Sequence, residues 1–163
     1  MPMKRGAPIP VLEGATEWVN GEIAATDLQG KPTLVHFWSI SCGSCHEIMD
    51  HVKAWREKYG PRGLEFVGIH MPRGEKDTNT EAVKADIEEM AVAWPQAIDN
   101  RHAIVDAFEN KYVPAFYLFN EAGEMTHFQA GDRGQKMLEG AIERLLKASA
   151  PVEAGATAEA GVA

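Results

Sequence analysis

The chain contains two cysteines, Cys42 and Cys45, which stand three residues apart where an apolar run ends and a helical pattern begins. The apolar run covers residues 33–38, and the helical pattern starts at the second cysteine. Two thiols in the first turn of a helix lie on one side of it, within reach of a disulfide bond. The spacing therefore predicts a reversible two-electron switch between a dithiol and a disulfide.

The two sulfurs are expected to differ in reactivity. Cys42 would lie at the start of the helix, where unpaired backbone N–H groups and the positive end of the helix dipole favour a thiolate, while Cys45 would lie one turn inside. Lowering a thiol pKa from about 8.5 to near 7 corresponds to about 2 kcal/mol of stabilisation of the anion, which a helix terminus and a nearby cation can supply. We therefore expect Cys42 to be the attacking nucleophile and Cys45 to be the resolving cysteine.

Size and charge narrow the class of protein. A chain of 163 residues with 45% hydrophobic residues can bury one core and is expected to form a single domain. We also expect the protein to be a monomer. The net charge of -8, without a cluster of Lys and Arg, argues against nucleic acid as a partner. The apolar runs are far shorter than the roughly 20 residues that cross a bilayer, so no membrane segment is expected.

The number of cysteines and the N-terminal residues indicate the cellular compartment of the protein. In a reducing cytosol, two lone cysteines indicate catalysis or metal binding rather than a structural disulfide. Pro and Gly punctuate residues 6–10, where a signal peptide would carry its apolar core. We therefore expect a cytoplasmic protein.

Strand and helix patterns alternate along the rest of the chain. Strands are predicted at residues 18–19, 33–38, 64–70, 94–98 and 115–120, and after a hairpin at 121–124. Helices are predicted from residue 45 to 59, after a capping-box pattern at 78–81, at 104–108 and after 132–135. The core face of the last helix is predicted to carry Met137, Leu138, Ala141, Ile142 and Leu145. The acidic segment at residues 86–89 is expected to form a solvated helix face.

This order of elements predicts an α/β fold, a three-layer sandwich with a mixed central sheet and helices on both faces. Residues 1–149 are expected to form one domain. Residues 150–163 are rich in Ala, Gly and Glu and have no core face, so we expect them to form a disordered tail.

Three features together resemble the active site of the thioredoxin-like superfamily. They are Trp38 four positions before Cys42, the Cys-x-x-Cys pair after a buried strand, and Val113-Pro114 at the opening of a late strand. More narrowly, the segment DLQGKPTLVHFW at residues 27–38 is similar to the TlpA/ResA-like branch of that superfamily. An extra strand and helix at about residues 71–100 also fit that branch.

The resemblance implies a thiol-disulfide oxidoreductase with a thioredoxin-like fold and no cofactor or metal besides its redox-active disulfide. Its partners would be a substrate protein or a small-molecule disulfide or dithiol, and an upstream redox partner. The Cys42 thiolate would attack a disulfide, and Cys45 would release the reduced partner from the mixed disulfide. Pro114, with Val113 before it, is implied to have a cis peptide bond and to shape the partner groove beside the sulfurs.

Several positions depart from the pattern of the superfamily. His36 stands where thioredoxins often have a buried Asp, and Gly68 stands at the position of its lysine partner. Ile48 replaces an acidic residue of ResA-like proteins, Asp50 replaces a helix-kinking proline, and Ser41 replaces the common Trp. These departures bear on the redox potential and the partner rather than on the reaction.

Three residues near the cysteines each have two interpretations. His36 is either a hydrogen-bonded core histidine or, placed under Cys45, the acceptor of the proton of the resolving thiol. His46 either tunes Cys42 through proximity or is a plain surface residue. Trp38 either offers a docking surface or packs in the core.

Two alternatives use the same cysteines to hold a prosthetic group or a metal. The sequence Cys-x-x-Cys-His that ends at His46 is also the attachment site of c-type haem, with Met71 or Met90 available as a second ligand. A zinc site would combine both cysteines with His46 and His51.

Two further alternatives keep the fold and change the function. A peroxiredoxin would fit Ser39 three positions before Cys42, but Val35 stands where that family has proline. The domain could also act as a redox-sensing binding protein whose cysteines respond to the redox state with little turnover.

Overall fold

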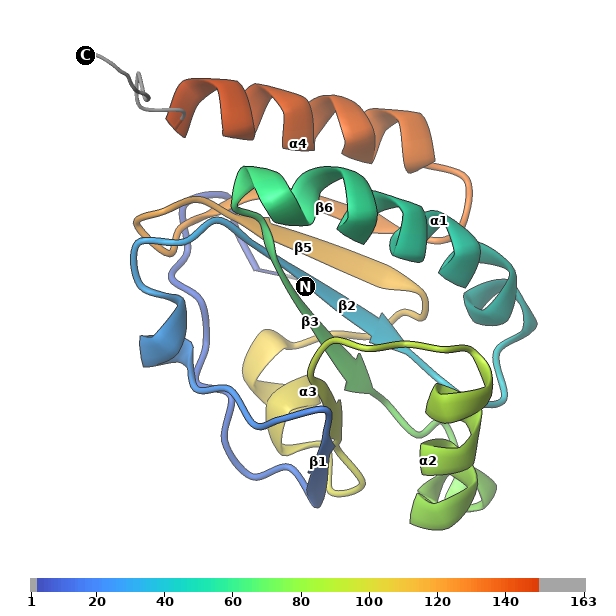
Figure 1. Cartoon of the computed structure of the whole chain (residues 1–163). Helices are drawn as coiled ribbons and strands as arrows, with labels where there is room; N and C mark the ends of the chain where they lie inside the picture. The colour runs from blue at the N-terminus through green and yellow to red at the C-terminus, as the bar shows by residue number, and fades with distance from the viewer. Residues whose placement is uncertain (1–2, 150–163) are drawn as a thin grey trace.

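The computed structural model describes residues 3–149, so the tail predicted at residues 150–163 lies outside the described residues (Figure 1). In this part of the chain six strands form one sheet in the order β1-β4-β3-β2-β5-β6. The strands are β1 (Glu17–Val19), β2 (Thr33–Trp38), β3 (Glu65–His70), β4 (Gln96–Ile98), β5 (Ala115–Phe119) and β6 (Met125–Ala130). β2, β3 and β4 are parallel, while β1, β5 and β6 each run antiparallel to a neighbour.

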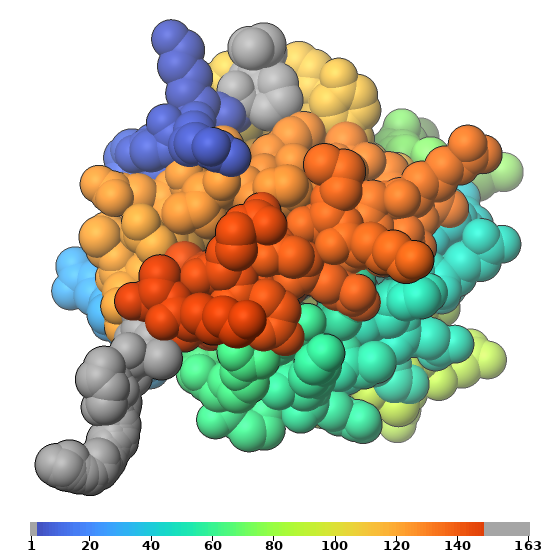
Figure 2. All heavy atoms as spheres, turned by 90° about the horizontal axis from the view of Figure 1, so that it is seen from above, coloured from blue at the N-terminus to red at the C-terminus, as the bar shows by residue number. Residues whose placement is uncertain are grey.

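Helices cover both faces of the sheet, which confirms the predicted three-layer α/β fold. The α-helices are α1 (Gly43–Tyr59), α2 (Thr80–Glu89), α3 (Ala103–Phe108) and α4 (Gln135–Ser149). Short 3-10 turns are η1 (Ala25–Leu28), η2 (Gly60–Arg62) and η3 (Glu75–Thr78). Helices α1 and α4 lie side by side over one face and α3 lies on the other, as Figures 1 and 2 show. None of the helices formed by residues 3–149 combines the length and the hydropathy needed to traverse a lipid bilayer.

Strand β2 lies at the centre of the molecule and all six of its residues are buried. Its side chains alternate between the two layers: Leu34 and Trp38 join the cluster under α1 and α4, while Val35 and Phe37 join the cluster on the α3 side. This double burial is the reason that the strand appears in the sequence as a nearly continuous apolar run.

Helix α1 packs through the stripe predicted from its periodicity, which consists of Ile48, Met49, Val52, Trp55 and Tyr59, all of them buried. Trp55 contacts the ring of Phe116 on β5 edge to face, with 5.7 Å between centroids. The chain leaves the helix through η2 and turns at Gly63, whose φ of 106° is the left-handed conformation that glycine adopts without strain. The packing therefore fixes the start of α1, and with it the cysteines, above the end of β2.

Two local predictions were wrong by one position. The N-cap of α2 is Asn79, whose side chain accepts from the N–H of Ala82, while the hydroxyl of Thr78 donates to the Glu75 carbonyl of η3. On α4, Leu138, Ala141 and Ile142 are buried as predicted and Leu145 is partly buried, but Met137 is 66% exposed and Leu146 is buried in addition. A residue next to a core position points about 100° away from it on a helix, which explains why Met137 faces solvent.

Candidate active site

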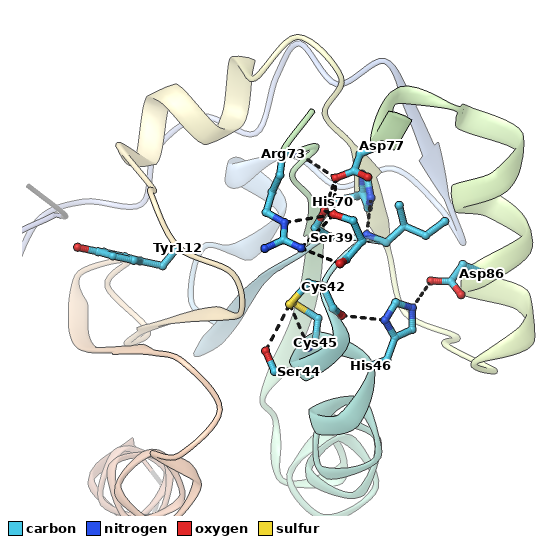
Figure 3. The surroundings of a disulfide bond; sticks show 12 residues. Ser39, Cys42, Ser44, Cys45, His46, His70, Arg73, Asp77, Asp86 and Tyr112 are labelled. Atoms are coloured by element: carbon cyan, nitrogen blue, oxygen red, sulfur yellow. Dashed lines mark hydrogen bonds and ion pairs between the residues drawn. A yellow bond between two sulfur atoms is a disulfide. The ribbon is translucent and has the colours of Figure 1, made fainter. Parts of the chain in front are cut away.

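Cys42 and Cys45 form a disulfide at the start of α1, with 5.2 Å between their Cα atoms (Figure 3). Cys42 is the N-cap of the helix: its backbone is extended and its Sγ accepts from the N–H of Cys45 at 3.1 Å. Cys42 keeps 4% of its surface exposed, whereas Cys45 has 0%. Of the two cysteines, Cys42 is therefore the one that lies nearer the surface.

The peptide bond between Val113 and Pro114 is cis, as the resemblance implies. Pro114 is buried directly before β5, whose first residue, Ala115, is the register partner of Phe37 on β2. Val113 is partly buried against the cluster that contains both cysteines. The proline therefore lies at the same end of the sheet as the disulfide.

His46 connects Cys42 to helix α2. Its Nδ1 lies 2.9 Å from the carbonyl oxygen of Cys42, and its Nε2 lies 2.7 Å from Oδ2 of Asp86. Both partners are acceptors, so the doubly protonated imidazolium satisfies both contacts. Burial alone would lower the pKa of His46, but the hydrogen bonds to Cys42 and Asp86 and the nearby charges of Asp86 and Glu89 outweigh it and raise the pKa. Both contacts therefore favour the protonated, positively charged form of a ring that lies one turn from Cys42.

The chain before Cys42 is held by Asp77, a buried residue that follows β3. Its Oδ2 accepts from the hydroxyls of Ser39 and Ser41, each at 2.8 Å, and from the backbone N–H of Arg73 at 2.9 Å. The Arg73 guanidinium donates to the carbonyl of Ser41 at 2.7 Å (Figure 3). Burial raises the pKa of Asp77, but its three donors outweigh burial and lower the pKa below the usual value. We call these four residues, Ser39, Ser41, Arg73 and Asp77, the Asp77 cluster.

His70 binds Ile40, the residue between Ser39 and Ser41 in the loop before Cys42. It is fully buried at the end of β3, and its Nε2 accepts from the backbone N–H of Ile40 at 3.0 Å. Burial lowers the pKa of His70 to about 4 despite the nearby carboxylates, so the ring stays neutral and keeps an acceptor nitrogen for Ile40. The three residues 39–41 are therefore all tied to the end of β3 or to the segment that follows it.

His36 lies in the core and stacks on Phe116, with 4.5 Å between ring centroids. Within residues 3–149 neither of its ring nitrogens has a hydrogen-bond partner, so the interpretation of a hydrogen-bonded core histidine is wrong. Burial lowers the pKa of His36 to about 3, which leaves a neutral ring. Its place beside Phe116, which belongs to the cluster that contains Cys45, is compatible with the hypothesis of proton transfer.

Trp38 packs in the core and does not form a docking surface. It is 1% exposed, and its Nε1 donates to Oε1 of Gln96 at 2.9 Å. The Gln96 side chain fills the space that a Cβ atom at Gly68 would occupy. Gly68 is the register partner of His36. The two residues that replace the usual buried acid and its lysine partner are therefore neighbours in the structure.

The site contains residues that sequence reasoning missed or misjudged. Asp86 was expected on a solvated helix face, yet it pairs with His46 and keeps only 17% of its side chain exposed. Asp77 and Arg73 had no motif around them, and they reach the site only through tertiary contacts. A polar pair such as Ser39 and Ser41 directly after a buried strand is the one local sign of the network.

The arrangement does not favour the alternatives. Both nitrogens of His46 are engaged by Cys42 and Asp86, so its ring is not presented as a haem ligand. Among residues 3–149, no group of three or more His, Cys, Asp or Glu side chains could hold a metal ion. The hydroxyl of Ser39 donates to Asp77, away from the sulfur.

Residues 6–128 match the sequence profile of the AhpC/TSA family. The thiol-disulfide oxidoreductase YkuV of Bacillus subtilis is 47% identical over 145 residues, which are 88% of this chain and 97% of YkuV. The thiol-disulfide oxidoreductase ResA of Bacillus anthracis is 24% identical over 80% of this chain and 72% of ResA. The solution structure of a thioredoxin-like protein in the oxidized form superposes with a TM-score of 0.82, at 46% identity over 90% of this chain and 99% of that one.

Proposed function

The chain belongs to the AhpC/TSA family and is a thioredoxin-like, TlpA/ResA-like thiol-disulfide oxidoreductase, and from this premise we propose that Cys42 attacks and Cys45 resolves. The Cys42 thiolate attacks one sulfur of a partner disulfide, and the other partner sulfur leaves as a thiolate. Cys45 then attacks the Cys42 sulfur, which releases the second partner thiol and closes the bridge. The partner gains two electrons and the protein loses two.

One observation carries this order of attack: Cys42 is the cysteine that keeps exposed surface, and it is the N-cap of α1. There the helix dipole and the imidazolium of His46 both favour a thiolate. A thiolate at Cys42 is the better nucleophile toward a partner and also the better leaving group when Cys45 attacks.

Pro114 and His36 are proposed to assist at the two sulfurs. Pro114 has no N–H, and with Val113 it would form the wall of the partner groove next to Cys42. A neutral His36 has one unprotonated nitrogen that could take the proton of the Cys45 thiol. Because burial lowers its pKa to about 3, His36 would pass the proton on rather than keep it.

Insulin reduction with dithiothreitol tests the activity. Wild-type protein should accelerate the precipitation of the insulin B chain, and Cys42→Ser should remove all acceleration. Asp50→Ala, at an exposed position farther along α1, should retain it. A protein that opens and closes its own bridge but leaves insulin intact would be a redox sensor and would overturn the proposal.

We also propose that the disulfide is the sole redox group and that the protein acts in the cytoplasm as a monomer, on disulfides of proteins or small molecules. Both cysteines belong to the reactive pair, so neither serves as a structural staple, as expected in a reducing compartment. A Soret band or stoichiometric zinc in the purified protein would contradict the claim that the disulfide is the sole redox group. Cell fractionation would test the location, and light scattering would test whether the protein is a monomer.

A further inference from the structure

An open groove with a volume of about 590 Å³ begins beside the reactive disulfide. Its lining residues are Met71, Pro72, Arg73, His102, Lys111, Tyr112, Val113, Ala130 and Gly131. One end reaches the site through Arg73, whose guanidinium is bound to Ser41, the residue before Cys42. The other side is formed by the segment that leads into Pro114. A chain that offers its sulfur to Cys42 would continue into this groove.

The charges along the groove have one sign. Arg73 and Lys111 are exposed, and none of the nine lining residues is acidic, although the whole chain carries a net charge of -8. The ion pairs of residues 3–149 involve neither cation. The carboxylate of Asp77 is occupied by the two serine hydroxyls and the Arg73 backbone, and does not form an ion pair with the guanidinium. Within residues 3–149 no carboxylate therefore neutralises either cation, although the Arg73 guanidinium also donates to Ser41.

Tyr112 gives the groove an exposed aromatic side chain on a loop that is held from the core. It is 49% exposed, an unusual value for a large side chain next to the core. Its carbonyl accepts from Nδ2 of Asn110 at 2.8 Å, and Oδ1 of the same Asn110 accepts from the hydroxyl of Tyr117 at 2.9 Å. Asn110 and Tyr117 are buried, so the loop that presents Tyr112 is held from the core. A preorganised, exposed aromatic residue is typical of an anchor for a partner chain.

We propose that this groove binds the polypeptide segment that flanks the reactive cysteine of the partner, and that Arg73 and Lys111 select segments with acidic residues there. This inference rests on the proposed function and names its substrate class. Opposite charges across an interface mainly accelerate association and reject like-charged partners, and salt screens the effect.

Three model peptides of one sequence test the selectivity. Each carries one cysteine as a mixed disulfide with 2-thiopyridine, a neutral leaving group, and the two residues on each side of the cysteine are Glu, Gln or Lys. The reduced protein converts the mixed disulfide into a peptide thiol and thiopyridone while its own dithiol becomes a disulfide. We expect release from the Glu peptide to be about 3- to 10-fold faster than from the Gln peptide at low salt, with the ratio near 1 in 0.5 M NaCl.

Charge reversal at Lys111 isolates the groove from the chemistry. Lys111→Glu should lower the Glu/Gln rate ratio and speed the Lys peptide, whereas Lys31→Glu, at the opposite end of β2, should keep the wild-type ratio. Equal rates for the Glu and Gln peptides, or an unchanged ratio in Lys111→Glu, would overturn acidic selectivity while leaving the exchange reaction intact. A failure to release thiopyridone from any peptide would instead refute the proposed function on which the selectivity rests.

Discussion

Nε2 of His46 lies 2.7 Å from Oδ2 of Asp86, a residue forty positions later on a different helix. The other ring nitrogen contacts the carbonyl of Cys42, so one imidazole joins the cysteine turn to α2. A contact of this kind holds the ring in position and favours its protonated form, because a carboxylate stabilises the imidazolium.

Loss of this pair should raise the pKa of the Cys42 thiol. We expect His46→Asn to raise it by about half a unit, which corresponds to the 0.3–1 kcal/mol of a charge near a helix end. Asp86→Asn should act in the same direction, since it removes the hydrogen bond and the charge that raise the pKa of His46. The pH dependence of alkylation of the reduced protein by iodoacetamide measures the effect. His51→Asn, on the same helix, is the control, and an equal shift there would argue against a specific role of His46.

Replacement of Cys45 should trap the partner. Without the resolving thiol, the mixed disulfide on Cys42 cannot collapse, so reduced Cys45→Ser should accumulate a covalent complex with insulin whose disulfides are intact, or with another protein that carries a disulfide. Non-reducing electrophoresis and mass spectrometry detect the complex. The converse variant Cys42→Ser should trap none, and efficient trapping through Cys45 would show that the order of attack is reversed.

His36 should make the protein sensitive to acid. Burial lowers the pKa of His36 from 6.5 to about 3. Between these two pH values His36 is therefore protonated in the unfolded state and neutral in the folded state. Stability is then lost as the pH falls from about 6.5 toward 3, at up to about 1.4 kcal/mol per pH unit for this one group. We expect His36→Phe, which keeps a ring against Phe116, to flatten that part of the profile in urea unfolding. His70 contributes in the same direction, so the slope should shrink and not vanish.

The same variant tests proton transfer. If His36 accepts the proton of the Cys45 thiol, His36→Phe should change the pH profile of insulin reduction beyond what its stability explains. An unchanged profile in a folded variant would remove that role.

A methyl group at Gly68 should disturb the core. The Cβ atom of Gly68→Ala would collide with the Gln96 amide, which holds Trp38. We expect a loss of about 1–3 kcal/mol in the free energy of unfolding, the usual cost of overpacking. The cost should be smaller in a Gln96→Ala background, where the space is empty, and Gly74→Ala, whose Cβ meets nothing within 4 Å, is the control. Additive effects of the two substitutions would contradict a direct collision.

Asp77 should stabilise the loop before Cys42. Asp77→Ala leaves the buried Ser39 hydroxyl without its acceptor, and we expect a cost of about 1–3 kcal/mol. The pKa of Asp77 is lowered in the folded protein, so its contribution is present above the unfolded pKa near 4 and is lost as the pH falls through the folded value. Urea unfolding at pH 7 and pH 3 measures the difference. Asp50→Ala, an exposed acid on α1, should be nearly neutral, and a similar cost there would deny the loop contacts a special role.

Local patterns predicted most of the fold and the reactive pair. The buried run of β2 and the helical stripe of α1 depend on neighbours within one turn or one strand, and both are visible in the chain. Met137 and Thr78 were misplaced by one position, because a choice between adjacent residues at the start of a helix depends on how that helix lies on the sheet.

The surroundings of the disulfide depend on distant residues and were not predictable in the same way. Asp77 and Asp86 follow β3 and come close to the cysteine turn only after β2 and β3 pair. Gln96 is on β4, and its need for space explains Gly68 only once the register of the strands is known. No pattern within the motif itself contains this information.

The Asp77 cluster and the His46–Asp86 pair have a practical consequence for protein engineers. A graft that carried only the Cys-x-x-Cys turn and Pro114 into another scaffold would bring both sulfurs and leave behind the tethers on either side of them. We expect such a chimera to form its bridge yet exchange it sluggishly, until residues 73–86 are transplanted as well.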